Sequence, residues 1–268
     1  MGPFDGELLM KNTPNFISIF ALCLLASSCG PSKAKRVQES SLRLRVAQEM
    51  HAKGDTIQAM AELLKAENLN PEEAEIQNML GLLFAEKGST AEAEKHFRKA
   101  VQLDKEFSEA HNHLCILYIE LNRYDEAIAQ CTKAVENITY ATPERAYHNM
   151  GIAYEKKGDI PKATEAYRKA LLRNPNFVMS RKALGVIYMD QKKYKEAAAE
   201  LEFAGKACKA SPKGAWGSEC SETMYRLAVS YVNLRQRDKA AAAFKSCVEA
   251  DKEGVYGEKC RSNLKVIE

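Results

Sequence analysis

The sequence lacks most of the features that mark catalytic, metal-binding or nucleic-acid-binding proteins. Its formal net charge is only +3 over 268 residues, and no basic run is interleaved with aromatic residues, so nothing favours a nucleic-acid partner. It has no C-x-x-C or H-E-x-x-H motif, no glycine-rich phosphate loop and no nucleophile elbow. We therefore expect no enzyme activity, no cofactor, no metal site, no small-molecule substrate and no nucleic-acid partner.

Long hydrophobic runs are also missing. The most apolar stretch, residues 16–26, has 11 residues, whereas about 20 are needed to cross a bilayer. That length suits the hydrophobic region of a signal peptide. The sequence that follows, LASSCG at residues 25–30, resembles the lipobox of bacterial lipoproteins, whose cysteine is acylated after cleavage. We therefore predict a lipoprotein-type signal peptide over residues 1–28, with Cys29 as the lipidated first residue of the mature chain.

Two alternatives stay open at this end of the chain. A plain secretory peptide with an incidental Cys29 fits the same apolar stretch. Acidic residues before Met10 are unusual in a signal peptide, so translation can start at Met10 instead of Met1. Residues 29–39 have no apolar periodicity and are expected to form a lipidated tether. By resemblance to other lipoproteins, Gly30 after the cysteine favours the periplasmic face of the outer membrane.

What the sequence does contain is a pattern that returns about every 34 residues from residue 40 onwards. Counted from the start of each frame, position 8 is always small and position 20 is always alanine. The residues at position 8 are Ala47, Gly81, Cys115, Gly151, Gly185 and Ala228. The alanines are Ala59, Ala93, Ala127, Ala163, Ala197 and Ala240. Small residues let two helices approach closely, and larger residues at positions 11 and 24 fill the space beside them.

This pattern resembles the tetratricopeptide repeat (TPR), whose G-x-x-Y, A-x-x-x-F and Pro spacing is matched well between residues 144 and 177. Each helix pair of such a repeat has a face that it cannot bury alone, so the pairs stack. We therefore expect an all-α, right-handed TPR solenoid of six helix–turn–helix repeats and a C-terminal capping helix over residues 255–268. The predicted repeats are residues 40–73, 74–107, 108–141, 144–177, 178–211 and 221–254.

The period is broken twice. Two extra residues separate the third and fourth repeats, and nine separate the fifth and sixth. The longer insertion holds Trp216, the only tryptophan of the chain. Trp216 either plugs a gap between neighbouring repeats or is an exposed anchor for a partner, because tryptophan is enriched at binding hot spots.

Six cysteines remain once Cys23 has left with the signal peptide and Cys29 is acylated. An even number in an oxidising compartment favours disulfides. Six cysteines allow fifteen pairings, and symmetric placement about the predicted turns favours three of these bridges. They are Cys115–Cys131, Cys208–Cys220 and Cys247–Cys260. The alternative is a set of buried free thiols, because cysteine is also an ordinary small core residue.

The first helix of each repeat, helix A, is expected to line the concave face of the solenoid. Aliphatic residues recur along it and would form a protein-binding groove. They are Leu44, Leu82, Ile116, Ile119, Ile152, Val186, Met189 and Val229. Ordinary packing between helices would produce the same stripe. His111, four residues before Cys115, suits a large packed position of helix A better than a metal site.

The lipobox, the six repeats and the spacer Thr142–Arg145 (TPER) together resemble the type IV pilus biogenesis lipoproteins of the PilF, PilW and Tgl family. The cysteine content and the spacer are closest to Tgl. The resemblance implies a pilotin, an outer-membrane lipoprotein that binds secretin subunits and promotes their outer-membrane insertion and multimerisation. It also implies anchoring through Cys29 and binding through the helix A groove. The alternative is a generic periplasmic TPR scaffold for cell-wall or outer-membrane assembly factors.

Overall fold

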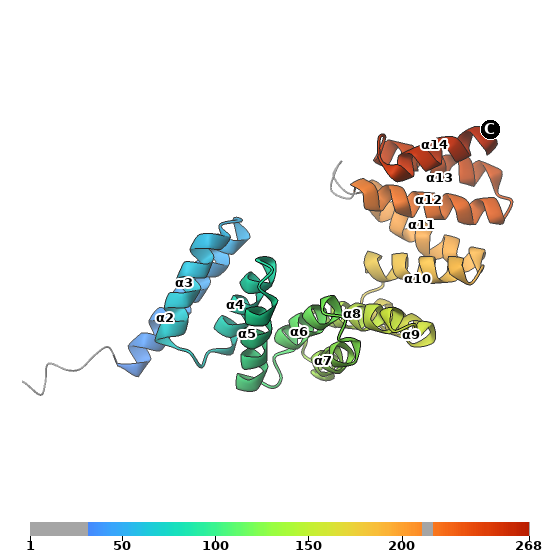
Figure 1. Cartoon of the computed structure of the whole chain (residues 1–268). Coiled ribbons are helices and arrows are strands. Elements are labelled where there is room, and N and C mark those ends of the chain that lie inside the picture. The colour runs from blue at the N-terminus through green and yellow to red at the C-terminus, as the bar shows by residue number, and fades with distance from the viewer. Residues whose placement is uncertain (1–31, 211–216, 268) are drawn as a thin grey trace, which may run out of the picture. The chain divides into compact units, whose positions relative to one another are not determined.

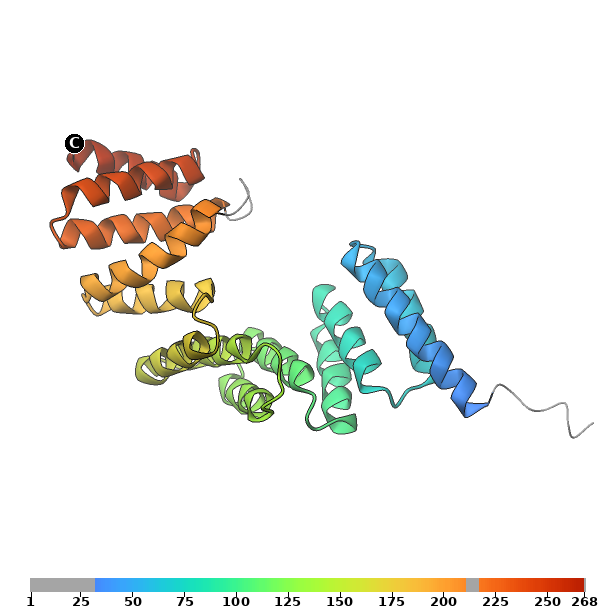
Figure 2. The same ribbon diagram turned by 180° about the vertical axis from the view of Figure 1, so that it is seen from behind.

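The computed structural model describes residues 32–210 and 217–267 of the chain. These two ranges contain thirteen α-helices and no strand (Figures 1 and 2). The predicted all-α fold is therefore confirmed. None of the helices in the described ranges is long and apolar enough to cross a membrane.

The helices follow one another as pairs, with helix A first and helix B second in each pair. The first three pairs are α2 (Lys33–Ala52) with α3 (Thr56–Leu69), α4 (Ala74–Glu86) with α5 (Thr90–Leu103), and α6 (Ser108–Glu120) with α7 (Tyr124–Glu136). The next three are α8 (Pro143–Lys156) with α9 (Ile160–Arg173), α10 (Val178–Asp190) with α11 (Tyr194–Ala210), and α12 (Gly217–Asn233) with α13 (Arg237–Ala250). The last helix, α14 (Val255–Ile267), packs on α13 and α12.

The chain divides into two compact units between Pro71 and Glu72. The described part of the first unit is the single pair α2–α3, and the second unit holds α4 to α14. The second unit has two apolar cores, and α9 contributes to both of them. Ala166 belongs to the core formed with α5 to α8, whereas Tyr167 belongs to the core that continues to α14. Helix α9 therefore joins the two halves of the second unit.

Helices A and B meet where position 8 faces position 24, which is the contact that the small residues predict. A Cβ atom added to Gly151 would lie 2.5 Å from Cε1 of Tyr167, and one added to Gly81 would lie 2.5 Å from Cδ1 of Phe97. At these two contacts a Cβ atom would force the ring to move, so glycine allows the ring to lie directly against the backbone of helix A. All six alanines at position 20 are fully buried.

Each of the six pairs turns through one residue in the left-handed conformation. The residues are Gly54, Gly88, Asn122, Gly158, Lys192 and Arg235, with φ between +57° and +85°. Glycine and asparagine adopt this conformation readily, and a residue in it commonly ends a helix. Lys192 and Arg235 adopt it without that intrinsic preference, so the fold imposes the turn on them.

A polar contact joins helix A to helix B in four of the pairs, between residues 19 apart in the sequence. At each of these sites position 4 meets position 23. The contacts are Arg43–Glu62, Gln77–His96, His111–Gln130 and Arg181–Glu200, with donor–acceptor distances of 2.8, 2.8, 2.7 and 2.8 Å. The other two pairs have a large residue with an alanine instead, as in Met224 with Ala243. Positions 4 and 23 therefore complement each other in every pair, either through a polar contact or through a large residue beside a small one.

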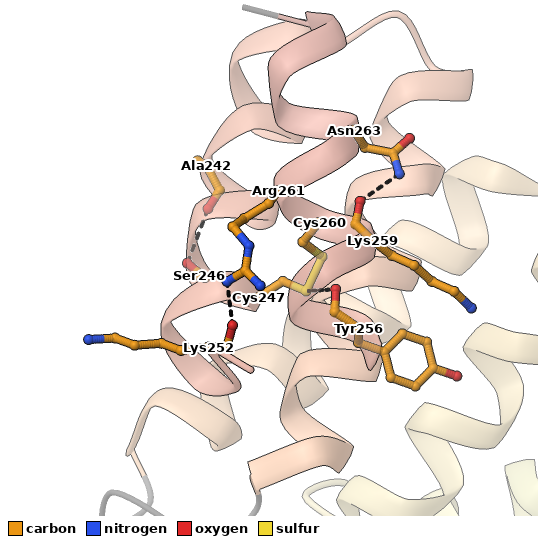
Figure 3. The surroundings of a disulfide bond; sticks show 9 residues. All are labelled: Ala242, Ser246, Cys247, Lys252, Tyr256, Lys259, Cys260, Arg261 and Asn263. Carbon is orange, nitrogen blue, oxygen red and sulfur yellow. Dashed lines mark hydrogen bonds between the residues drawn. A yellow bond between two sulfur atoms is a disulfide. The ribbon is translucent and has the colours of Figure 1, made fainter. Parts of the chain in front are cut away.

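The six cysteines form the three bridges that the spacing favours. Cys115–Cys131 joins positions 8 and 24 of the third pair, so a disulfide stands where glycine meets an aromatic ring in the second and fourth pairs. Cys208–Cys220 joins α11 to α12. Cys247–Cys260 fastens α14 to α13 (Figure 3). Near this last bridge, the guanidinium of Arg261 donates to the carbonyl oxygen of Lys252, which closes the turn before α14 (Figure 3).

Two segment boundaries differ from the sequence prediction. Residues 33–39, expected to belong to the tether, form the first two turns of α2, because Ser32 caps the helix by accepting a hydrogen bond from the backbone N–H of Lys35 (3.4 Å). At the other end, the nine-residue insertion is partly helical. Helix α12 begins at Gly217, four residues before the predicted repeat, so Cys220 lies inside a helix.

Candidate protein-binding surface

The predicted groove residues of the second unit lie on helices A and are for the most part half buried. Those in the half-buried class are Leu82, Ile119, Ile152, Val186, Met189 and Val229. Ile116 is the most accessible of the set, at 37% exposed. Leu82 and Ile119 pack against one apolar core, and Ile152 and Met189 against the other. The stripe therefore serves core packing and also leaves part of each side chain at the surface.

Leu44 does not fit the predicted groove. It is 5% exposed and is one of the buried side chains of α2, together with Ser40 and Ala47. The same repeat position is also buried in Asn112 and His148. Leu44 is therefore a core residue of the first pair.

Helices α8, α10 and α12 together line a cleft of about 370 Å³. Two of the predicted residues, Ile152 and Val186, lie in it, and Met179, which is 52% exposed, adds an accessible apolar side chain. His148 of α8 also lines the cleft, and its Nδ1 lies 3.1 Å from Ser180 Oγ of α10, so these two helices are in contact beside the cleft. The size of the cleft suits a few side chains of a bound segment.

Charged residues surround the apolar part of this cleft. The ammonium of Lys182 on α10 lies 3.6 Å from carboxylate oxygens of Glu219 and Glu222 on α12. Arg226 donates to Glu222 at 2.8 Å. Burial works to raise the pKa of Glu222, but the hydrogen bond from Arg226 and the charge of Lys182 outweigh it and hold the pKa below its usual value. Glu222 therefore stays ionised and keeps the two cations in place.

Successive helices A are also linked by polar side chains that are buried or half buried. His113 Nδ1 donates to Asn78 Oδ1 (2.8 Å), and Asn149 Nδ2 donates to Asn112 Oδ1 (2.9 Å). The third link joins His148 Nδ1 and Ser180 Oγ, 3.1 Å apart. Burial lowers the pKa of His148 to about 4, and burial with the nearby charge of Arg145 lowers the pKa of His113 to about 4. Both rings are therefore neutral at physiological pH. The three polar contacts hold neighbouring helix pairs together.

Comparison with known families agrees with this architecture. Four family models match the sequence, each described as a tetratricopeptide repeat, over residues 55–108, 84–138, 144–177 and 222–252. Together these matches span more than half of the chain, and they lie on the helix pairs described above. The chain is a TPR protein.

Solved TPR structures share the fold. PilF of Pseudomonas aeruginosa superposes with a TM-score of 0.74 at 18% identity, covering 85% of this chain and 99% of that one. PilW, a widely conserved type IV pilus biogenesis factor, gives 0.70 at 20% identity, covering 82% and 97%. YrrB, a TPR protein with an unusual peptide-binding site, gives 0.54 at 18% identity, covering 75% and 97%. No curated protein matches the sequence significantly.

His111 has a structural explanation within the TPR pattern. It is 3% exposed and occupies position 4 of its repeat. Its Nε2 donates to the carbonyl oxygen of Lys105 (3.0 Å), and its Nδ1 lies 2.7 Å from Gln130 Oε1. Both ring nitrogens are therefore engaged, and the two cysteines nearby are joined to each other. Across the part of the chain that the structure describes, no group of three or more His, Cys, Asp or Glu residues is placed to hold a metal ion.

Two predicted functional residues of this TPR protein, Cys29 and Trp216, lie outside the described residues. The signal peptide at residues 1–28 and the first part of the tether lie outside them as well. Lipidation and the role of the tryptophan therefore stay predictions. The cleft at α8, α10 and α12 is the part of the predicted surface that the structure defines.

Proposed function

We propose that this TPR protein is an outer-membrane lipoprotein that works as a pilotin in type IV pilus biogenesis. In this role it binds secretin subunits and promotes their insertion and multimerisation in the outer membrane. The similarity of fold to PilF and PilW over more than four-fifths of this chain carries the proposal. The lipobox at Cys29 and the TPER spacer support it, and the spacer and the bridged cysteines favour the Tgl branch of the family.

The proposed mechanism combines capture with tethering. The helix A cleft holds an apolar segment of a secretin subunit, with Ile152, Met179 and Val186 as the contact surface. The acyl chains on Cys29 hold the solenoid at the periplasmic face of the outer membrane; one chain alone binds a bilayer only marginally, and several bind it stably. Tethering raises the local concentration of the captured subunit at the membrane into which it inserts. No step of this mechanism needs a catalytic group, so we propose a non-enzymatic role.

Three variants test the proposal in cells. Deletion of the gene is expected to abolish the heat-stable secretin multimer while secretin monomers persist. Cys29→Ser should release the protein from the outer membrane and strongly reduce the multimer. Met179→Asp should reduce it without detaching the protein, because this side chain is 52% exposed in the cleft. The measurement is an immunoblot of membrane fractions.

The matched control is Leu172→Asp, because Leu172 is 81% exposed on α9 and lies outside the lining of the cleft. It should leave the multimer unchanged. An unaltered multimer in the deletion strain would overturn the pilotin assignment. An unaltered multimer with Met179→Asp alone would overturn the assignment of the cleft. Photo-crosslinking from positions 116 and 152 to secretin would then show whether another part of helix A is used.

The alternative is a periplasmic TPR scaffold for cell-wall or outer-membrane assembly factors. The helix A surface favours it as much as it favours a pilotin, because TPR surfaces of this kind are fitted to protein segments in general. A pull-down with the lipidated protein separates the two. Recovery of secretin supports the pilotin, and recovery of cell-wall enzymes without secretin supports the scaffold.

A further inference from the structure

The positive charge of the chain from Cys29 onwards is concentrated at its start. Residues 29–45 contain five basic residues and one acidic residue, whereas residues 46–268 contain 33 of each. The repeat array beyond residue 45 is therefore neutral as a whole, and the net charge comes from the segment next to the predicted lipid anchor. Three of the five cations, Lys33, Lys35 and Arg36, lie within the first four residues of α2.

Cations at this end of a helix work against its electrostatics. The free backbone N–H groups give a helix N-terminus a partial positive charge, so acidic residues stabilise that end and basic residues stabilise the other. Nine of the helices in the described ranges have an acidic residue in the first turn, as α4 does with Glu75. Helix α2 has none. An anion outside the helix would therefore stabilise its three cations.

The described part of the chain does not supply that anion. Lys33, Lys35 and Arg36 form no ion pair with any residue in it. Glu39 is the one acidic residue among residues 29–45, and the guanidinium of Arg43 holds its carboxylate at 2.8 Å. All three cations are exposed to solvent. They are therefore open to a partner outside the chain.

The start of α2 extends beyond its partner helix, which keeps these cations accessible. Arg43 also contacts Glu62 of α3 at 2.8 Å, seven residues before α3 ends at Leu69. In an antiparallel pair, the residue of α2 opposite Leu69 is then Arg36, seven residues before Arg43. Lys33 and the residues up to Arg36 therefore extend past the end of α3 (Figures 1 and 2).

The predicted lipid anchor is close to these cations along the chain. Three residues separate Cys29 from Lys33, and the chain can span at most about 14 Å over that distance. The headgroup layer on each side of a bilayer is about 5–8 Å thick, and charges attract each other over about 8 Å at physiological salt. An acylated Cys29 therefore keeps the start of α2 within reach of the lipid headgroups.

We propose that the first turn of α2 is a membrane-docking surface, on which Lys33, Lys35 and Arg36 bind the headgroups of anionic phospholipids. This inference rests on the proposed lipidation of Cys29, which brings the surface to the membrane. Charge complementarity selects the partner, because anionic headgroups supply the negative charge that this helix end lacks. Several acyl chains already prevent detachment, so the cations contribute position. They hold the start of the first helix pair against the bilayer, whereas the neutral repeat array is not attracted to it.

The test uses residues 29–268 with a single lipid chain attached to Cys29. The other six cysteines of this range form disulfides, so Cys29 is the one free thiol and accepts a maleimide-linked myristoyl chain. One such chain binds a bilayer weakly and reversibly, so the contribution of the cations can be measured. Sedimentation with vesicles gives the partition coefficient. Adding phosphatidylglycerol to phosphatidylcholine vesicles should raise it about a hundredfold, at about fivefold for each cation.

Neutralising the three cations together should remove most of this increase. The variant carries Lys33→Gln, Lys35→Gln and Arg36→Gln. Its thermal unfolding temperature should not fall, because the cations do not stabilise the helix end. The charge-conserving variant with Lys33→Arg, Lys35→Arg and Arg36→Lys should keep the increase. A salt concentration of about 0.5 M should abolish the increase in the parent protein.

The matched control removes three other cations, with Lys156→Gln, Lys193→Gln and Lys195→Gln. These side chains are also exposed and form no ion pair in the described part of the chain, and the change in net charge is the same. The control should keep the preference for phosphatidylglycerol, because its cations are far along the chain from Cys29.

The inference is overturned if phosphatidylglycerol does not strengthen binding or if the increase persists at high salt. It is also overturned if the two neutralised variants lose binding equally, since net charge alone would then explain the attraction. A lower unfolding temperature in the first variant alone would assign the three cations to stability and would overturn it as well. The assay contains no secretin, so its outcome is separate from that of the pilotin test.

Discussion

Single residues set how closely helix A and helix B of each pair approach. Where position 8 is glycine, an aromatic or leucine side chain at position 24 lies over it, as Tyr167 does over Gly151. Where position 8 is alanine, position 24 is Leu63 opposite Ala47 and Phe244 opposite Ala228, and all four side chains are buried. An aromatic residue therefore occurs opposite alanine as well as opposite glycine, and the approach of the two helices is adjusted within each pair.

The close contact of Gly151 with Tyr167 predicts a non-additive effect of two substitutions. Gly151→Ala should destabilise the protein by about 1–3 kcal/mol, because the new Cβ collides with the ring of Tyr167. The double variant with Tyr167→Leu reproduces the Ala47 and Leu63 combination of the first pair. It should be less destabilised than the sum of the single variants, as measured by urea unfolding in a double-mutant cycle. Strict additivity would mean that the residues at positions 151 and 167 do not compete for the same space.

The buried histidines make stability depend on pH. The pKa of His148 is about 4 in the folded protein, against about 6.5 in an unfolded chain. A lowered pKa means that the unfolded state binds more protons between these values. Stability is therefore full above pH 6.5 and falls as the pH drops towards 4, by about 3 kcal/mol for this residue.

His148→Gln should remove that part of the pH dependence, because glutamine keeps a polar contact for Ser180 and does not titrate. Urea unfolding at pH 7 and pH 4.5 provides the measurement. The loss between the two pH values should be smaller in the variant than in the parent protein. His113→Gln should behave likewise, since its pKa is lowered by the same cause, burial. An unchanged pH dependence in both variants would mean that the rings are hydrated.

At the scale of helices and turns, the six equivalent turns contain residues that differ in how readily they adopt the left-handed conformation. The first four repeats have glycine or asparagine at the left-handed position, whereas the last two have Lys192 and Arg235 at φ values of +58° and +57°. A residue with a Cβ atom is strained there by about 1 kcal/mol relative to glycine. The fold therefore carries this cost twice in its C-terminal half.

Lys192→Gly should stabilise the protein by about 0.5–1 kcal/mol, and Arg235→Gly should do the same. The reverse change at an equivalent site, Gly158→Ala, should destabilise it, although a Cβ atom there meets no neighbour within 4 Å. Thermal unfolding of the three variants is the measurement. A lower Tm for Lys192→Gly would mean that the entropy of the unfolded chain outweighs the strain.

The repeats themselves could be predicted from sequence because the same residue type recurs at the same position of each repeat. Alanine at one position means little, but alanine at position 20 in six consecutive frames identifies the fold. The same frame places the three bridges, since Cys115 and Cys131 stand at the two positions that face each other. The sequence carries one more periodic signal, because residues 19 apart are complementary, as in Arg43 with Glu62 and Arg181 with Glu200.

Features without a period could not be predicted in the same way. The early start of α2 depends on one hydrogen bond from the backbone of Lys35 to Ser32. The repeat position of Leu44 is buried in three pairs and half buried in the other three, so the period alone does not give its exposure. The loop after α7 is joined to the loop after α5 through Asn137, whose amide reaches a carbonyl group 31 residues away. Nothing in the local sequence predicts that contact.

At the scale of the whole molecule, covalent bridges and apolar cores are unevenly distributed. The first unit consists of one described helix pair, with Leu63 as its largest fully buried side chain and no disulfide among its described residues. The second unit has two apolar cores and all three disulfides. In a solenoid, each pair is stabilised mainly by its own packing and by its nearest neighbours. Local stability should therefore rise from the first unit to the second.

Hydrogen exchange read by mass spectrometry should reveal this gradient. Amides of α2 and α3 should exchange at least about tenfold faster than those of α6, α7, α12 and α13, because opening a single pair exposes little apolar surface. Each bridge constrains a loop of 12 to 16 residues and contributes about 3 kcal/mol. Reduction of the disulfides should therefore speed exchange in α6, α7, α13 and α14. It should leave exchange in α4 and α5 nearly unchanged. The helices without a bridge serve as the internal control. Equal protection in α2 and α13, before and after reduction, would mean that the chain unfolds as one cooperative body and that the two units are not separate in stability.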